Sequence, residues 1–274
     1  MLDPGLYVVA TPIGNLQDIT LRALQVLGDV ELVAAEDTRR SAQLLNHHGL
    51  RAALKSVHEH NESKRIPELL SLIRNGHAVA LISDAGTPLV SDPGFRLVQA
   101  VVEEGFSVYS VPGPSALTAA ISVSGLASDR FLFEGFLPAK AAARKTRLEV
   151  LAAQTATLVF FESSHRILDS LEAMAAVFGG QRKAAVCREL TKQFETVLRG
   201  SLADVIETVK SDRNQRKGEF VVVVKGSVET DSEVDGLTLA RALLEYLPPA
   251  QAARVAAKVG SGSRREIYAA LQSE

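Results

Sequence analysis

The sequence is almost without cysteine. Its 274 residues include one, Cys187, so neither an intramolecular disulfide nor a cysteine cluster for zinc can form. A chain of this length buries enough apolar surface to fold without cross-links. The residues just before Cys187 are apolar, and nothing beside it would activate a thiolate. We therefore predict a buried strand thiol rather than a catalytic cysteine.

Segments for export or membrane insertion are also missing. Asp3 and Pro4 precede a short apolar run with no basic segment before it, so no secretory signal peptide is predicted. No apolar stretch of about 18 residues free of charges occurs, which argues against a membrane span. The expected location is the cytoplasm.

Several common binding motifs are absent as well. There is no GxGxxG after a strand, no GxxxxGK[ST] and no HExxH, and the six histidines are scattered. These absences argue against the usual dinucleotide fingerprint, a P-loop and a zinc site. No metal is predicted.

Charge of one sign is not in excess overall. The 30 Lys and Arg residues balance 32 Asp and Glu residues, for a net charge of −2. This excludes a uniformly basic nucleic-acid binder and a polyacidic disordered chain, but not RNA binding through a local basic face. The charges are in fact segregated. Residues 138–151 and 254–265 are basic, whereas residues 228–236 hold four acidic residues and no cation.

Apolar runs and amphipathic stretches alternate through the first part of the chain, which predicts an α/β domain with a parallel sheet covered on both faces. Thr20 is a predicted N-cap. The expected strands are residues 6–10, 31–35, 53–57, 77–82 and 106–111, and the expected helices are residues 20–27, 39–48, 63–74, 95–104 and 115–123.

A second α/β domain with more antiparallel character is predicted beyond residue 126, followed by a small helical tail. Ser263 and Glu266 form a predicted capping box for the last helix. The predicted domains are residues 1–126, 127–227 and 237–274, with an acidic linker at 228–236. In the second domain the expected strands are residues 131–136, 157–161, 183–188, 194–198 and 220–225, and the expected helices are 140–152, 166–177 and 202–209. The tail helices are expected at 237–246 and 251–259, before the capped one.

Three loops rich in glycine and proline follow predicted strands, at residues 10–16, 82–94 and 111–117. The carboxyl ends of parallel strands are where open α/β sheets bind ligands. Each loop alone is compatible with an ordinary turn. Three of them on one rim indicate a binding crevice.

These loops and several further segments resemble the tetrapyrrole methylase superfamily of S-adenosylmethionine-dependent methyltransferases. Within it they resemble the bacterial subgroup that 2′-O-methylates the ribose of a cytidine in small-subunit (16S) ribosomal RNA. The tail, LPPAQAARVAAKVGSGSRREIYAAL (247–271), resembles the small helix-turn-helix found in many members. The segments that carry the main resemblance are GLYVVATPIGNLQDITLRAL (5–24), AAEDTRR (34–40), LISDAGTPLVSDPG (81–94), VPGPSAL (111–117), FLFEGFLPAK (131–140), FFESSHRI (160–167), CRELTKQFE (187–195) and KGEFVVVV (217–224).

The resemblance implies two α/β domains with S-adenosylmethionine bound in the cleft between them. Thr87 stands where the wider family usually has aspartate, so Asp84 is the alternative carboxylate. The positions that match cofactor-binding places of the family are Pro12, Asp84, Ala85, Gly86, Thr87, Val90, Ser115, Ala116, Glu162 and Leu190.

A ribose hydroxyl is a poor nucleophile at neutral pH, so a general base is expected. Asp37, beside the cleft in the family fold, is the first candidate, and Glu36 is the second. The structural alternative for Asp37 is an N-cap of the following helix. His165 and Glu189 are further candidates, each with a structural alternative.

RNA would be held by its phosphates through Lys and Arg. The alternative is that these cations are solvated helix faces. Lys140 and Arg144 are four residues apart, which predicts one shared helix face. The predicted RNA-binding residues are Arg39, Arg40, Lys140, Arg144, Arg166 and Lys192.

The expected partners are small-subunit ribosomal RNA or the 30S particle, and a second copy of the chain, because family members are commonly homodimers. Two other functions remain open. A methylase acting on a tetrapyrrole or another small molecule would share the cofactor site, but needs a cleft with few cations. A non-catalytic RNA-binding assembly factor would leave the three loops unexplained.

Overall fold

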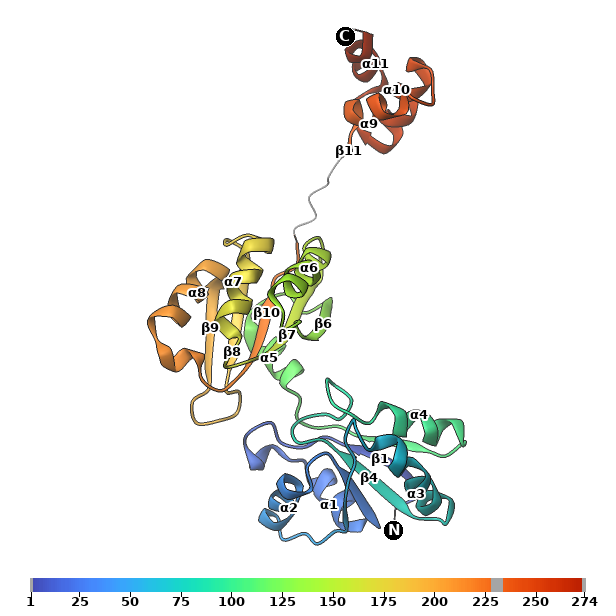
Figure 1. The fold of residues 1–274 in the computed structure, drawn as a ribbon, viewed down its shortest axis with the longest axis vertical. Coiled ribbons are helices and arrows are strands. Elements are labelled where there is room, and N and C mark those ends of the chain that lie inside the picture. Colours follow the sequence, from blue (N-terminus) through green and yellow to red (C-terminus); the bar gives the residue numbers. More distant parts are fainter. Residues whose placement is uncertain (1, 228–233, 273–274) are drawn as a thin grey trace. The chain divides into compact units, whose positions relative to one another are not determined.

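The computed structural model describes residues 2–227 and 234–272. By its internal contacts the chain forms two compact units, Met1–Gly226 and Ser227–Glu274. The larger unit contains two five-stranded sheets, and the smaller unit is helical (Figure 1).

The first sheet is wholly parallel, with the strand order β3-β2-β4-β1-β5. Its central strand β4 is buried at every residue, as expected for a strand covered on both faces. Residues of α1 and α2 pack on one face, and residues of α3 and α4 pack on the other. The strands are β1 (Gly5–Val9), β2 (Leu32–Ala35), β3 (Leu54–Ser56), β4 (Ala78–Ile82) and β5 (Val108–Val111), and the helices are α1 (Leu21–Asp29), α2 (Thr38–His47), α3 (Glu62–Arg74) and α4 (Phe95–Glu103).

The start of α1 shows how local sequence fixes these elements. Thr20 has an extended backbone, and its side chain accepts a hydrogen bond from the Ala23 amide at 3.1 Å. This satisfies one of the free amides in the first turn. The predicted N-cap is therefore confirmed. A short 3₁₀ helix, η1 (Leu16–Asp18), precedes it and was not predicted.

The second sheet has the order β6-β7-β10-β8-β9 and is mostly antiparallel. Only the β6–β7 pair is parallel, so the predicted antiparallel character is confirmed. Helices α6, α7 and α8 cover one face. The strands are β6 (Phe131–Phe136), β7 (Thr157–Ser163), β8 (Lys183–Arg188), β9 (Thr196–Ser201) and β10 (Glu219–Val224), and the helices are α6 (Ala141–Leu151), α7 (Ile167–Phe178) and α8 (Leu202–Ser211). A short 3₁₀ helix, η2 (Arg213–Arg216), follows α8.

Helix α5 (Ala116–Ser124) covers the other face of this second sheet, where Ala120 packs among residues of β7, β8 and β10. The predicted boundary at residue 126 separates α5 from the sheet that it covers. The thiol of Cys187 lies in the same core and contacts the carbonyl of Ala120 at 3.8 Å. Burial raises its pKa to about 11, so the prediction of a buried strand thiol is confirmed.

Strand β9 begins two residues later than predicted. The carbonyl of Phe194 accepts a hydrogen bond from Arg188, and the Glu195 carboxylate accepts one from the Thr191 amide at 2.6 Å. These side chains hold residues 194 and 195 in the preceding loop, so the ladder starts at Thr196.

The smaller unit contains α9 (Gly236–Leu243), α10 (Pro249–Val259) and α11 (Arg264–Gln272), with the short parallel pair β11 (Val234–Asp235) and β12 (Gly260–Ser261). Small residues of α9 and α10 pack around Ile267. Ser263 and Glu266 exchange hydrogen bonds at 2.9 and 3.3 Å, so the predicted capping box is confirmed. Most of the predicted acidic linker, residues 228–233, lies outside the described residues.

No helix in the described ranges is long and apolar enough to cross a membrane.

Candidate functional site

A cavity of about 460 Å³ in the larger unit is lined by loops that follow strands of the first sheet, by the start of α5 and by strands of the second sheet. This volume lies within the usual range for small-molecule sites. It includes eight of the ten residues predicted to bind the cofactor. These are Ala85, Gly86, Thr87, Val90, Ser115, Ala116, Glu162 and Leu190.

The other two predicted cofactor residues, Pro12 and Asp84, are not among the lining residues. Pro12 follows Thr11, which forms an antiparallel bridge with Gly86 through hydrogen bonds of 2.8 and 2.9 Å. Its neighbour on the other side, Ile13, does reach the cavity. Pro12 therefore lies in the bridged loop and is not one of the residues that line the cavity.

Thr87 ties the second predicted loop to the third, because its hydroxyl donates a hydrogen bond to the Pro114 carbonyl at 3.1 Å. The Thr11–Gly86 bridge ties the first loop to the second. The three loops selected from the sequence are thus linked to one another. Thr87, which stands where the wider family usually has aspartate, serves this connection.

Backbone strain is concentrated in the loops around the cavity. Four non-glycine residues in the described part of the chain have positive φ, and they fall in two loops. Leu89 and Ser91 have φ of 71° and 66°, and Glu189 and Thr191 have φ of 51° and 65°. Such conformations cost free energy and persist where the surrounding structure enforces them, often at functional sites.

Glu162, at the carboxyl end of β7, lines the cavity, but its carboxylate points into a buried network. The side chain is 1% exposed. One carboxylate oxygen accepts from the Ser163 amide at 2.8 Å, and the other accepts from Ser170 at 2.6 Å and from Arg166 at 3.1 Å. Arg166 also donates to the Leu137 carbonyl. The side chain of Arg166, a predicted RNA-binding residue, is thus engaged with a buried carboxylate.

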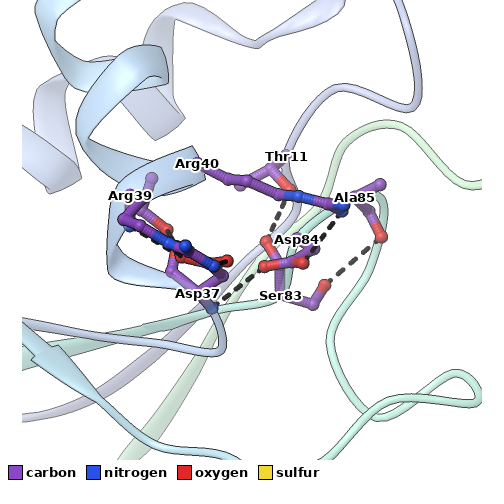
Figure 2. A network of polar contacts seen from close by, with 8 residues as sticks. Thr11, Asp37, Arg39, Arg40, Ser83, Asp84 and Ala85 are labelled. Carbon is purple, nitrogen blue, oxygen red and sulfur yellow. Dashed lines mark hydrogen bonds and ion pairs between the residues drawn. The ribbon is translucent and has the colours of Figure 1, made fainter.

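Asp37, the first candidate for the general base, caps α2 (Figure 2). Its carboxylate accepts from the Arg39 amide at 2.9 Å and from the Arg39 guanidinium at 2.7 and 3.1 Å. Hydrogen bonding to Arg39 holds the pKa of Asp37 well below its usual range, which makes the carboxylate a weak base. Asp37 is also not among the cavity-lining residues. The N-cap alternative is confirmed, and these contacts argue against Asp37 as the base.

Asp84 connects α2 to the second loop. Its carboxylate accepts from the Asp37 amide and from the Arg40 guanidinium, both at 3.0 Å (Figure 2). The nearby Glu36 is half-buried, and burial together with the charge of Asp84 raises its pKa. The resemblance to the family implied that Asp84 is the alternative carboxylate for binding the cofactor. In the structure it instead fixes the position of α2.

Asp92 is a cavity residue that the sequence did not single out, although it lies in the second loop. Burial raises its pKa to about 6, and the charges of Glu36 and Asp84 add to this effect. A carboxylate with a perturbed pKa in a cavity is a candidate functional group. The only sequence signal for it was the loop as a whole, because burial and the approach of Glu36 from another loop depend on the fold.

The predicted basic residues differ in their exposure. Arg39 and Arg40 are 87% and 68% exposed, and Lys140 is exposed. Arg144 is 6% exposed and donates to the Ala139 carbonyl at 3.3 Å. The expected single basic face of Lys140 and Arg144 is therefore wrong, because the start of α6 turns Arg144 inward.

Lys192 lines the cavity and is held between Glu189 and Glu219 at 2.9 and 2.8 Å. These hydrogen bonds raise the pKa of Lys192 against the opposing effect of its own burial. Lys192 in turn lowers the pKa of Glu189, although burial of that carboxylate acts in the other direction. The Glu189 carboxylate is thus ion-paired with Lys192 and is not a free base. His165, the remaining candidate, is exposed.

Across residues 2–227 and 234–272, no group of three or more His, Cys, Asp or Glu side chains is placed to hold a metal ion.

Solved structures with the same fold include two that are named methyltransferases. A uroporphyrin-III-C-methyltransferase from Thermus thermophilus superposes with a TM-score of 0.57 over 81% of this chain and 94% of its own, at 22% identity. A cobalt precorrin-4 methyltransferase gives a TM-score of 0.60 over 80% and 94%, at 17% identity. At these identities the likeness establishes the fold. The fold and the cavity define a two-sheet α/β protein with a cavity of the size that small molecules occupy.

Comparison of sequences identifies the family of the chain. Residues 5–206 match the Tetrapyrrole (Corrin/Porphyrin) Methylases, and residues 230–274 match the RsmI C-terminal HTH domain. Relatives named "Ribosomal RNA small subunit methyltransferase I" occur in Xylella fastidiosa, at 50% identity over 98% of this chain and 99% of theirs, and in Pseudomonas aeruginosa, at 49% over 96% and 95%. The chain belongs to the tetrapyrrole methylase family. It is an S-adenosylmethionine-dependent methyltransferase.

Proposed function

We propose that this methyltransferase 2′-O-methylates the ribose of a cytidine in small-subunit ribosomal RNA. The observation that carries the proposal is the similarity to small-subunit ribosomal RNA methyltransferases over 98% of the chain, including its helical tail. The tetrapyrrole alternative has in its favour the shared fold and the match to the wider family, but neither of the relatives named above. Cytoplasmic location and a homodimer remain predictions.

The cavity suits S-adenosylmethionine in size and chemistry. Val90, Ala116 and Leu190 give it apolar walls, and the loop around Gly86 brings backbone groups to its surface. The adenine ring of this ligand needs apolar walls, and its charged amino acid end needs polar backbone groups. When bound, S-adenosylmethionine supplies a methyl group on a positively charged sulfur. The chain's own contribution is to hold the acceptor oxygen in line with that methyl, and orientation of this kind is worth about 7–11 kcal/mol.

Glu162 and Leu190 have different roles in the proposed cofactor site. The Glu162 carboxylate is occupied by Ser163, Ser170 and Arg166, so its backbone is what remains for the ligand. Leu190 sits between Glu189 and Thr191, both with positive φ, and this strained backbone fixes its approach to the cavity.

The decisive experiment compares methyl transfer to undermethylated small subunits, to free ribosomal RNA and to a precorrin. We expect transfer to RNA in one of the first two arms and none to the precorrin. Mapping should find one cytidine whose 3′ phosphodiester resists alkaline cleavage, since a 2′-O-methyl group removes the attacking hydroxyl. Methylation of the base alone, or transfer to the precorrin alone, would contradict the proposal.

RNA binding is expected to depend on Arg39 and Arg40, whose side chains are 87% and 68% exposed. The Arg39→Gln, Arg40→Gln double variant should weaken binding of small subunits whatever the sequence around the target. Two lost phosphate contacts should also reduce the slope of log K against log[salt] by about 2.

The matched control replaces two other exposed cations, with Lys64→Gln and Arg96→Gln, on α3 and α4. These residues are not among those that line the cavity. An equal loss of slope in the control would show that net charge, and not the position of Arg39 and Arg40, governs RNA binding.

A further inference from the structure

We propose that the ring of Phe136 is the platform on which the cytosine base of the target nucleotide stacks. The inference rests on the proposed function, because it requires a cytidine as the methyl acceptor. It deepens that function by assigning the side chain that holds the target base. Aromatic side chains are a common platform for RNA bases that have left their own stack.

The ring of Phe136 combines exposure with a place at the cavity. It is 55% exposed, and it is one of the lining residues. Other large apolar side chains are exposed in the described part of the chain, but Phe136 alone among them lines the cavity. An exposed phenylalanine elsewhere on a surface needs no explanation. Phe136 differs because it offers an open ring beside the space that we assign to S-adenosylmethionine.

A β-bulge in β6 brings this ring to the cavity. The register between β6 and β7 shifts by one residue between Phe133 and Gly135, so that Phe136 pairs with Phe161, which also lines the cavity. Without the shift Phe136 would pair with Glu162, whose carboxylate reaches α7 on the opposite face of the sheet. Because a slip of one residue moves a side chain to the other face, the bulge determines on which side Phe136 lies.

Contacts on both sides of the strand hold the bulge in place. Glu134, the residue without a partner on β7, forms an ion pair of 2.5 Å with Arg147 of α6. Gly135 has φ of 73°, and a Cβ there would lie 3.0 Å from the Ser91 hydroxyl oxygen. Glycine is therefore suited to this position both by its backbone conformation and by the close approach of the loop.

Two further rings support Phe136. The ring centroids of Phe136 and Phe161 are 5.8 Å apart at an interplanar angle of 67°, and those of Phe133 and Phe161 are 4.8 Å apart at 66°. Edge-to-face contacts of this kind stabilise aromatic pairs beyond the burial of their area. Phe133 and Phe161 pack against the core of the second sheet. The exposed ring is thus anchored to the sheet through buried neighbours.

Cations lie close to the exposed ring in the sequence and in the structure. Arg166, whose side chain is 26% exposed, donates a hydrogen bond to the carbonyl of Leu137, the residue after Phe136. Lys140 is exposed at the start of α6. Phosphates bind to cations and unstacked bases bind to rings, so this combination fits a nucleotide.

The chemistry of the substrate indicates which base would reach the ring. The reacting hydroxyl is on C2′ of the ribose, and the base is on the adjacent carbon, C1′. When that hydroxyl is held in line with the methyl group of the cofactor, the base of the same nucleotide must lie beside the cavity. Phe136 is the exposed aromatic side chain available there.

The Phe136→Ala variant tests the platform. Loss of one base–aromatic stack should lower kcat/KM for small subunits by about 5- to 150-fold. Phe136→Tyr keeps the ring and should stay within about threefold of the unsubstituted enzyme, whereas Phe136→Leu keeps apolar surface without a ring and should resemble Phe136→Ala. Normal kcat/KM in Phe136→Ala would overturn the proposal.

The matched control is Phe131, on the same strand, which is 45% exposed and does not line the cavity. Phe131→Ala should stay within about twofold of the unsubstituted enzyme, and both alanine variants should bind S-adenosylmethionine within about threefold of it by calorimetry. An equal loss of kcat/KM in Phe131→Ala would contradict a specific role of Phe136. Much weaker cofactor binding by Phe136→Ala would assign the ring to the adenine of the cofactor, and a changed sedimentation coefficient would assign it to a contact between copies. Either result overturns the proposal.

A substrate without the target base isolates the stack itself. Small subunits can be reconstituted with RNA in which the target ribose keeps its hydroxyl but has no base. On this abasic substrate Phe136→Ala should lower kcat/KM by no more than about twofold, because the contact that it removes is already missing. A loss as large as on unaltered subunits would show that Phe136 does not hold the target base. If the unsubstituted enzyme methylates no RNA hydroxyl at all, the proposed function fails, which is a separate result from any of these.

Discussion

Glu162→Ala is expected to destabilise the larger unit by about 3 kcal/mol, the lower end of the cost of breaking a buried ion pair. The substitution removes the acceptor of the Ser163 amide and the Ser170 hydroxyl, and it leaves Arg166 without its carboxylate. Arg166 is 26% exposed, so water relieves part of the penalty. For a unit of this size the melting temperature should fall by about 6–12 °C. Thermal unfolding followed by circular dichroism measures it.

The companion variants separate a structural role of Arg166 from a role in RNA binding. If Arg166 is mainly a partner of Glu162, Arg166→Ala should also lower the melting temperature, and the double variant should lose less than the sum of the two single variants. If Arg166 is mainly a phosphate contact, Arg166→Ala should leave stability intact and weaken binding of small subunits. Additive losses in the double variant would contradict the pairing seen in the structure.

The sequence predicted the elements of the first sheet well because its three inner strands, β1, β2 and β4, are apolar runs between turn residues. Strand β4 is the clearest case, since five buried residues in a row admit few other structures. The three loops were also found from glycine and proline, and their mutual links through Thr11, Gly86 and Thr87 agree with a single rim.

Contacts that helix spacing does not encode account for what the sequence did not predict. The inward turn of Arg144 depends on the Ala139 carbonyl, just before α6, and the engagement of Arg166 depends on Leu137 and Glu162. A pattern of charges along one helix contains no such information. The raised pKa of Asp92 could not be predicted either, because it arises mainly from burial and in part from the charges of Glu36 and Asp84.

The packing of α5 on the second sheet could not be predicted from the sequence for a different reason. Its residues, 116–124, continue the alternation of the first domain, so a boundary after them is the natural prediction. The helix nevertheless packs its small residues, including Ala116 and Ala120, on the second sheet. Since α5 begins at the cavity and ends on that sheet, it connects the two halves of the cavity.

This position of α5 makes Ala116 the most direct test of the cofactor site. Ala116 is the first residue of the helix, is half-buried and lines the cavity. A phenylalanine there would project into the space that we assign to S-adenosylmethionine. We expect Ala116→Phe to lower the affinity for S-adenosylmethionine by at least about 100-fold, or roughly 2.7 kcal/mol. Calorimetric titration of the ligand-free protein measures it without any RNA substrate.

A matched control lies two residues further along the same helix. Thr118 is exposed and does not line the cavity, so Thr118→Phe adds the same ring to the same helix without filling the site. Its affinity for S-adenosylmethionine should stay within about threefold of the unsubstituted protein. Melting temperatures show whether either ring disturbs the packing, since overpacking a core costs about 1–3 kcal/mol. Normal binding by a folded Ala116→Phe protein would move the cofactor out of this cavity.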